Sequence, residues 1–222
     1  APPERVVRPI SASSVYIEAL LVSGARISAP ARIAQSHSSN RKAVSRKRGR
    51  PIEAPAGLAT RPTSERAREA IFSMLVSRIG SFDGLRVLDL FAGSGAMGLE
   101  ALSRGAAHAT FVDQDRAAVA AIAASARALG CVDRAAILQG DATQLARATA
   151  PCHVVFVDAP YGAALTLPAI RGGAAQGWFA PGAILSVETA RDEALLVDGF
   201  DELAARRYGK ALVRLLRYQP EA

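Results

Sequence analysis

Apolar residues occur in short blocks along most of the chain, and two spacings alternate. Continuous apolar runs, typical of buried strands, are followed by segments in which apolar residues recur every three or four positions, as on one face of a helix. The predicted strands cover residues 86–91, 109–113, 135–138, 152–157 and 183–187. The predicted helices cover residues 96–104, 116–129, 143–148 and a stretch within 163–171. This alternation indicates an α/β fold with a doubly wound, mostly parallel sheet.

Two further elements flank the alternating region. A helix is predicted to open in the segment Arg61-Pro-Thr-Ser-Glu-Arg66, with Thr63 as its N-cap, and to end at Gly80. Its apolar face would hold Ala67, Ile71, Met74 and Leu75. Near the C-terminus, residues 202–208 and 211–218 predict an antiparallel hairpin that turns at Gly209-Lys210. The five strands and this hairpin together predict a seven-stranded sheet.

Positive charge is concentrated at the start of the chain. The formal net charge is +7, with +8 in residues 1–50 and −1 in residues 51–222. A basic run such as residues 41–50 attracts phosphates without reading sequence, which favours a nucleic-acid partner over acidic small molecules. A plain solvated tail is the alternative interpretation of this segment. We therefore predict an irregular or disordered basic arm over residues 1–45 and a folded domain over residues 46–222.

Other compositional features exclude several classes of protein. The two cysteines cannot form a disulfide framework, and they do not have the spacing of metal ligands. No apolar run reaches the roughly 18 residues of a membrane-spanning helix, and we identify no signal peptide. We expect a cytoplasmic protein without a resident metal.

The strongest local motif follows the first predicted strand. Gly93, Gly95 and Gly98 have the G-x-G-x-x-G spacing at a strand-to-helix turn, where backbone can approach a nucleotide closely. Asp113 ends the next strand, a position suited to ribose hydroxyls. These features alone fit NAD, FAD or S-adenosylmethionine (SAM), and a purely structural role of the glycines remains open.

Two further acids favour SAM. Asp89 lies inside the first strand, where a carboxylate suits the cationic methionyl part of SAM but would repel a pyrophosphate. Asp141 follows the third strand and is placed to accept a hydrogen bond from the adenine amine. An N-cap role for Asp141 is compatible with that function.

A second motif, Asp158-Ala-Pro-Tyr161, follows the fourth strand. It resembles the D-P-P-Y/F motif of SAM-dependent amino-methyltransferases, with Ala159 in place of the first proline. Asp158 and the Ala159 carbonyl would accept hydrogen bonds from an exocyclic amine and direct its lone pair at the methyl donor. Pro160 would hold Ala159 extended, and Tyr161 would stack on a base. The alternative is a strand cap followed by a tight turn.

Three blocks together resemble the RsmD family of bacterial methyltransferases over residues 46–218. They are Arg61 to Phe72, which is similar to the family's R-P-T-x-x-x-x-R-E-x-x-F block, Leu88 to Arg104, and Asp158 to Tyr161. The resemblance implies a Rossmann-like SAM-dependent methyltransferase fold. It also implies methyl transfer to N2 of a guanine in small-subunit (16S) ribosomal RNA, of the type acting at guanine 966. Of the family's usual glycine-containing opening strand, only Lys47-Arg-Gly-Arg50 is present.

The resemblance and the motifs give three predicted groups of site residues. The catalytic group is Asp158, Ala159, Pro160 and Tyr161. The SAM-binding group is Thr63, Asp89, Phe91, Ala92, Gly93, Gly95, Asp113, Gln114, Asp141 and Ala142. The RNA-binding group is Arg46, Lys47, Arg48, Arg50 and Arg61. The partner implied is ribosomal RNA in an assembling small subunit, with the target base in a loop or bulge and the protein a monomer.

Three other functions remain as alternatives: a DNA amino-methyltransferase, a non-catalytic SAM- or RNA-binding assembly factor, and a dinucleotide oxidoreductase. The scattered histidines and the two cysteines are interpreted as structural. Glu188, at the end of the fifth predicted strand, is interpreted as a solvated acid.

Overall fold

The structure is a computed structural model, and it describes residues 62–220. The helices are α1 (Pro62–Ile79), α2 (Ala96–Ser103), α3 (Arg116–Leu129) and α4 (Thr166–Ala175), with a 3-10 turn η2 (Val132–Arg134). The strands are β1 (Arg86–Leu90), β2 (His108–Asp113), β3 (Ala135–Gln139), β4 (Cys152–Asp158), β5 (Phe179–Ala190), β6 (Phe200–Tyr208) and β7 (Ala211–Tyr218).

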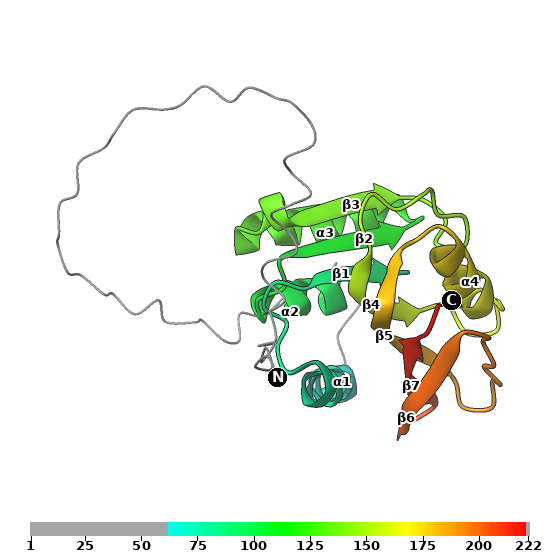
Figure 1. Cartoon of the computed structure of the whole chain (residues 1–222). Helices are drawn as coiled ribbons and strands as arrows, with labels where there is room; N and C mark the ends of the chain where they lie inside the picture. Colours follow the sequence, from blue (N-terminus) through cyan, green and yellow to red (C-terminus); the bar gives the residue numbers. More distant parts are fainter. Residues whose placement is uncertain (1–61, 221–222) are drawn as a thin grey trace, which may run out of the picture. The chain divides into compact units, whose positions relative to one another are not determined.

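The seven strands form one sheet in the order β3-β2-β1-β4-β5-β7-β6 (Figure 1). The first five strands along the chain are parallel, and β7 is antiparallel to both β5 and β6. The order reverses direction at β1, where β4 lies on the other side from β2, and ligands of open α/β sheets bind at such a switch point. The predicted mixed sheet with a C-terminal hairpin is confirmed.

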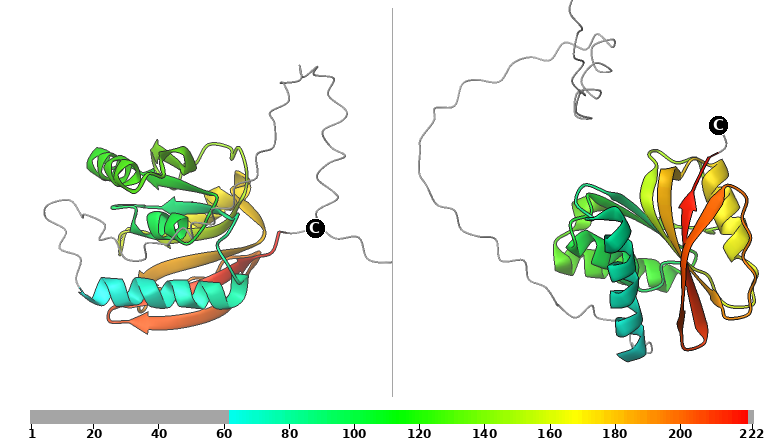
Figure 2. Two further views of the ribbon diagram at one scale, coloured as in Figure 1. Left: turned by 90° about the vertical axis from the view of Figure 1, so that its left-hand side faces the viewer. Right: turned by 60° about the horizontal axis from the view of Figure 1, so that its bottom comes forward.

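Helices cover the two faces of the sheet unequally. Buried side chains of α1, α2 and α3, including Phe72, Leu99 and Ile122, pack on one face in a single apolar cluster. Helix α4 and residues 142–145 pack on the other face in a second cluster. Figure 2 shows α1 and α4 on opposite sides of the strands. Because helices cover both faces of the parallel strands, successive residues of these strands are apolar.

Two local predictions are wrong. Helix α1 begins at Pro62, so Thr63 lies in its first turn and is not its N-cap. Proline suits the first helical position because its missing N–H has no partner there. Residues 143–148 form no helix. The Ala146 carbonyl instead accepts from Trp178 Nε1, and the Ala148 N–H donates to the Gln176 carbonyl, so tertiary bonds replace a helical ladder.

Two other elements are longer than predicted. Helix α4 continues to Ala175, and β5 extends from Phe179 to Ala190 with a register shift against β4 near its start. The predicted arm, its boundary at residue 46 and the basic segment 46–61 lie outside the described residues. Within residues 62–220, no helix is both long enough and apolar enough to cross a membrane.

Candidate active site

The functional motifs meet at one edge of the sheet, where the parallel strands end. Leu90, Asp113, Gln139, Asp158 and Glu188 lie at or near the carboxyl ends of β1, β2, β3, β4 and β5 in turn. Because neighbouring strands lie about 4.8 Å apart, residues far apart in the sequence become neighbours there. This edge is therefore where the sequence motifs can act together.

The glycine turn after β1 contains three residues in left-handed backbone. Their φ angles are +57° at Phe91, +53° at Gly93 and +74° at Gly95. A Cβ atom on Gly98 would lie 2.3 Å from Cε1 of Phe111, so Gly98 allows α2 to pack against β2. A Cβ atom on Gly93 would meet no atom closer than 4.0 Å. Gly98 is thus required by packing, whereas the side of Gly93 is open to an approaching ligand.

Asp89 is a buried carboxyl beneath this turn. Its side chain is 3% exposed, and Oδ2 accepts a hydrogen bond from the Gly98 N–H at 2.9 Å. Burial raises the pKa of Asp89 to about 8, the Gly98 hydrogen bond opposes this, and the charges of Asp158 and Asp113 add to it. A nearby cation would favour the ionised form, which fits the sulfonium and ammonium groups of SAM.

Asp113 and Asp141 organise the neighbouring loops. Asp113 accepts from the Gly93 N–H at 2.7 Å and from the Asp115 N–H at 2.8 Å, and so ties the glycine turn to the end of β2. Asp141 is exposed, and its Oδ1 accepts from both the N–H and the hydroxyl of Thr143. These two bonds lower the pKa of Asp141. The helix N-cap role considered for Asp141 is wrong, because no helix follows it, and its two bonds to Thr143 close a turn instead.

The segment Asp158-Ala-Pro-Tyr161 leaves the end of β4 beside the glycine turn. Ala159 is buried, whereas Pro160 and Tyr161 are exposed. The Asp158 carboxyl is reached by solvent, yet protein atoms around it remove part of its hydration. That loss of hydration, followed by the charge of Glu188, raises the pKa of Asp158 to about 7. Asp158 is therefore poised between its neutral and ionised forms near neutral pH.

Glu188 joins this group, although the sequence favoured a solvated acid. It pairs in register with Asp158 across β4 and β5, and its Oε1 accepts a hydrogen bond from the Tyr161 hydroxyl at 2.5 Å. Loss of hydration, together with this bond and the charge of Glu188, raises the pKa of Tyr161 above its usual range. The sequence showed that Glu188 lies at the end of a predicted strand. It did not show that Glu188 would pair with Asp158 and accept a hydrogen bond from Tyr161.

Exposed cations also lie at this edge. The register Ala190 to Ala211 places the turn between β6 and β7 beside the carboxyl end of β5. Arg206, Arg207 and Lys210 are exposed around that turn, and we call these three residues the hairpin cations. The two ion pairs within residues 65–220 involve Arg104 and Arg214. The hairpin cations were not among the predicted RNA-binding residues.

The remaining predicted residues divide by their surroundings. Gly95 and Ala142 are buried, Phe91 and Ala92 are half-buried against the two apolar clusters, and Gln114 is exposed. Thr63 is placed only as part of α1. The predicted RNA-binding residues, Arg46 to Arg50 and Arg61, fall outside the described residues.

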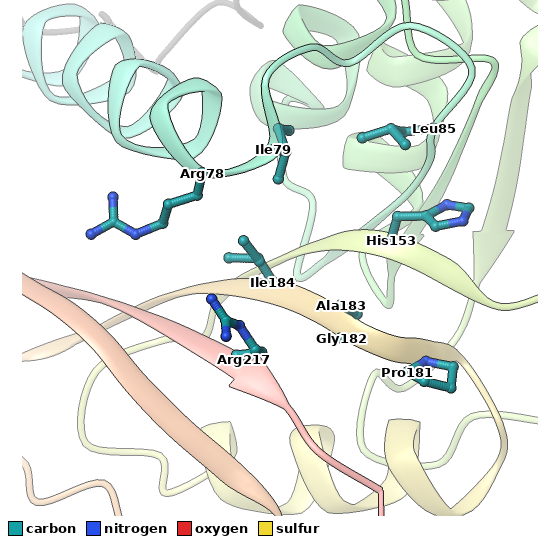
Figure 3. A pocket seen from close by; sticks show the side chains of 9 residues that line it. All are labelled: Arg78, Ile79, Leu85, His153, Pro181, Gly182, Ala183, Ile184 and Arg217. Carbon is teal, nitrogen blue, oxygen red and sulfur yellow. The ribbon is translucent and has the colours of Figure 1, made fainter. Parts of the chain in front are cut away.

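A pocket of about 230 Å³ lies at the opposite edge, where β4 and β5 begin. Figure 3 shows Arg78 from α1, Arg217 from β7 and His153 from β4 around it. The His153 Nδ1 accepts from the Arg86 N–H, which gives this histidine a structural role. None of the acids of the candidate active site lines this pocket.

Comparison with known proteins agrees with this geometry. A family model described as "Conserved hypothetical protein 95" matches residues 43–217. The chain is 41% identical over 119 residues to the putative rRNA methyltransferase YlbH of Bacillus subtilis, a match that covers 52% of this chain and 63% of that protein. It is 36% identical to ribosomal RNA small subunit methyltransferase D of Escherichia coli, over 67% of this chain and 73% of that protein.

Solved structures show the same relationship. A putative methyltransferase, yhhF from Escherichia coli, superposes with a TM-score of 0.68 at 32% identity, over 78% of this chain and 94% of that one. The putative methylase HI0767 from Haemophilus influenzae superposes with a TM-score of 0.62 at 29% identity, over 72% and 100% of the two chains. Since the family model spans most of the chain and the relatives share both its sequence and its fold, the protein belongs to the RsmD family.

Proposed function

We propose that this protein transfers a methyl group from SAM to the exocyclic N2 of a guanine in small-subunit ribosomal RNA. The observation that carries the proposal is the Asp158-Ala-Pro-Tyr161 segment, which ends β4 directly beside the open glycine turn of β1. Relatives named as ribosomal RNA methyltransferases support the substrate class. Guanine 966 is the position that the family resemblance suggests.

The residues present fit SAM. When bound, SAM supplies an activated methyl group on a sulfonium centre. The open side of Gly93 leaves room for a ligand at the turn, and the buried Asp89 provides a counter-charge for a cation. Asp113 and Asp141 lie along the same edge of the sheet. Asp113 would accept hydrogen bonds from the ribose hydroxyls, and Asp141 would accept one from the adenine amine.

Asp158 and the carbonyl of Ala159 would orient the amine. The amine of guanine is a poor nucleophile because its lone pair is delocalised into the ring. Two acceptors that hold its two N–H groups turn that lone pair out of the plane, and their positions are set before reaction. Asp158 must be ionised to accept in this way, and it can receive the proton that nitrogen loses once it carries the methyl group.

The hairpin cations would bind RNA phosphates near the target base. The row Asp158–Glu188–Val213–Arg206 runs directly across β4, β5, β7 and β6, so these four residues share one face. Three strand spacings, about 15 Å in all, separate Asp158 from Arg206, which corresponds to a few nucleotides of single-stranded RNA. The basic residues before Pro62 would add to this contact.

We further propose that the catalytic domain begins at residue 46 and that the protein is a monomer in the cytoplasm. Its substrate would be an assembling small ribosomal subunit. A non-catalytic assembly factor is the main competitor, because Ala159 replaces a proline of the family motif. The two differ in whether any methyl group is transferred.

The test is incubation of the protein and labelled SAM with small-subunit particles, naked ribosomal RNA and duplex DNA. The proposal expects label in RNA, and more of it in particles if ribosomal proteins complete the site. Label in DNA alone would identify a DNA amino-methyltransferase. SAM binding with no transfer to any of the three would overturn the enzymatic proposal.

A further inference from the structure

Glu188 stands beside Asp158 without a role in the proposed transfer. The two residues are direct register partners on adjacent parallel strands, so their side chains leave the same face of the sheet. Glu188 is half-buried near the end of β5. Two acidic side chains, of which that of Glu188 is longer by one methylene group, therefore lie on adjacent strands where the target amine would bind.

Tyr161 holds the Glu188 carboxyl in place. Its hydroxyl donates to Oε1 of Glu188, across 27 residues of sequence. A carboxylate offers four lone-pair positions, and this bond uses one of them. Tyr161 as a whole is 52% exposed, so its ring remains available to a base. Tyr161 thus links the two sides of the site, with its ring toward solvent and its hydroxyl on Glu188.

The chemistry of the bases gives this second acceptor a use. In guanine, the amine at C2 is adjacent to the N1–H donor. In adenine and cytosine, the exocyclic amine is adjacent to a ring nitrogen that accepts hydrogen bonds. A carboxylate next to the amine-binding acceptor would therefore attract guanine and repel the other two. Enzymes that act on an extruded base read its Watson–Crick edge in this manner.

We propose that Glu188 is the residue that selects guanine, by accepting a hydrogen bond from N1–H while Asp158 accepts from the amine at C2. This inference rests on the proposed function. Sites that hydrogen-bond a substrate N–H reject analogues lacking it by about 10⁴-fold, because the buried acceptor is then left unpaired. In this scheme Tyr161 is a positioning residue for Glu188 as well as a stacking platform.

The test compares two bases at the RNA position mapped as the methylation site. One substrate carries guanine, and the other carries 2-aminopurine, which keeps the amine at C2 but has an acceptor at N1. Single-turnover rates of the wild-type protein should fall by at least about 10³-fold on 2-aminopurine. In Glu188→Gln, the rate on guanine should fall by about 10²-fold. The ratio of 2-aminopurine rate to guanine rate should rise at least tenfold, because the amide can donate to N1.

Three variants separate this role from others. Glu188→Ala should lower the guanine rate without any gain on 2-aminopurine, because alanine offers no donor. Tyr161→Phe keeps the ring and removes the hydrogen bond, and it should change the ratio less than Glu188→Gln does. Glu193→Gln removes a neighbouring acid beyond the end of β5 and should leave both rates within twofold. Thermal melting and SAM affinity report whether each variant is folded.

The outcomes are distinguishable. A wild-type protein that methylates no guanine overturns the proposed function and this inference together. A wild-type protein that is active on guanine, with the same base ratio in Glu188→Gln as in the wild type, overturns only the role of Glu188. If Tyr161→Phe alone changes the ratio as much as Glu188→Gln, Glu188 acts only through Tyr161 and does not read the base.

Discussion

The two ends of the parallel strands differ in chemistry, although the same strands form both. At the carboxyl ends, Asp89, Asp113, Asp158 and Glu188 gather on neighbouring strands, and mutual repulsion adds to loss of hydration in raising the pKa values of Asp89 and Asp158. At the amino ends, burial and the charge of Arg86 lower the pKa of His108. The carboxyl ends thus bring four acids together, and the pKa values of two of them, Asp89 and Asp158, are raised to about 8 and about 7.

The difference follows from topology. A parallel sheet brings all its carboxyl ends to one edge, where loops can differ in length without disturbing the core. The amino ends carry the pocket of Figure 3, but its lining of Arg78, His153 and Arg217 contains no acid. A cavity alone therefore does not identify the active site in this fold, whereas converging groups with perturbed pKa values do.

The largest effect is expected from Asp158→Ala. Loss of the acceptor that orients the amine should lower methyl transfer by about 10³-fold, with SAM affinity nearly unchanged, because the acids proposed to hold SAM are Asp89, Asp113 and Asp141. Single-turnover rates and calorimetric titration of SAM measure the two quantities. Asp133→Ala, at an exposed acid in η2, is the matched control. Full activity of Asp158→Ala would remove the functional distinction between the two ends.

The pH dependence of transfer should show the next largest effect. Since the pKa of Asp158 is raised to about 7 and its ionised form is required, the rate should rise about tenfold per unit below pH 7 and level off above it. Glu188 contributes to that raised pKa, so Glu188→Gln should move the midpoint to lower pH. A rate that falls as pH rises through 7 would contradict the assignment.

Neutralising the hairpin cations should have a moderate effect. The triple replacement of Arg206, Arg207 and Lys210 by glutamine should weaken RNA binding about tenfold at low salt. It should also reduce the slope of log affinity against log salt by up to about 2, which is about 0.7 for each lost phosphate contact. SAM affinity should not change. Filter binding or fluorescence anisotropy at several salt concentrations checks this.

A control triple replaces exposed arginines away from this turn, namely Arg127, Arg147 and Arg171. Equal losses of RNA affinity in both triples would show that total charge, and not its place beside the active site, determines binding.

The smallest effect is expected at the amino ends. Arg217→Gln removes a cation from the lining of the pocket in Figure 3 and should change transfer and RNA affinity by less than twofold. The same assays measure it. A loss comparable to that of Asp158→Ala would mean that the pocket takes part in the reaction.

Much of the fold was predictable because local signals agreed with the final structure. Helix α3 spans the predicted residues, with Asp115 as its N-cap and Gly130 in left-handed backbone after it. The strand, glycine turn and helix around Gly93 also follow from the local sequence. In these segments, periodicity and capping residues determine the element without help from distant contacts.

The errors arose where distant contacts decide. The loop at 143–148 has helix-forming residues, but its carbonyl at residue 146 bonds Trp178 instead. The pairing of Glu188 with Asp158 depends on the register of β4 with β5, and the placement of the hairpin cations depends on the register of β5 with β7. Register across a sheet is set by whole-strand packing, which a single sequence does not display.

The chemical identity of the methylated nucleoside separates transfer to guanine N2 from every alternative reaction. Small-subunit particles lacking the modification are incubated with SAM and either the wild-type protein or Asp158→Ala, and the RNA is digested to nucleosides for mass spectrometry. We expect N2-methylguanosine at a single position with the wild-type protein and none above background with the variant. Methylation of adenine or cytosine amines instead, or equal N2-methylguanosine with both proteins, would contradict this expectation.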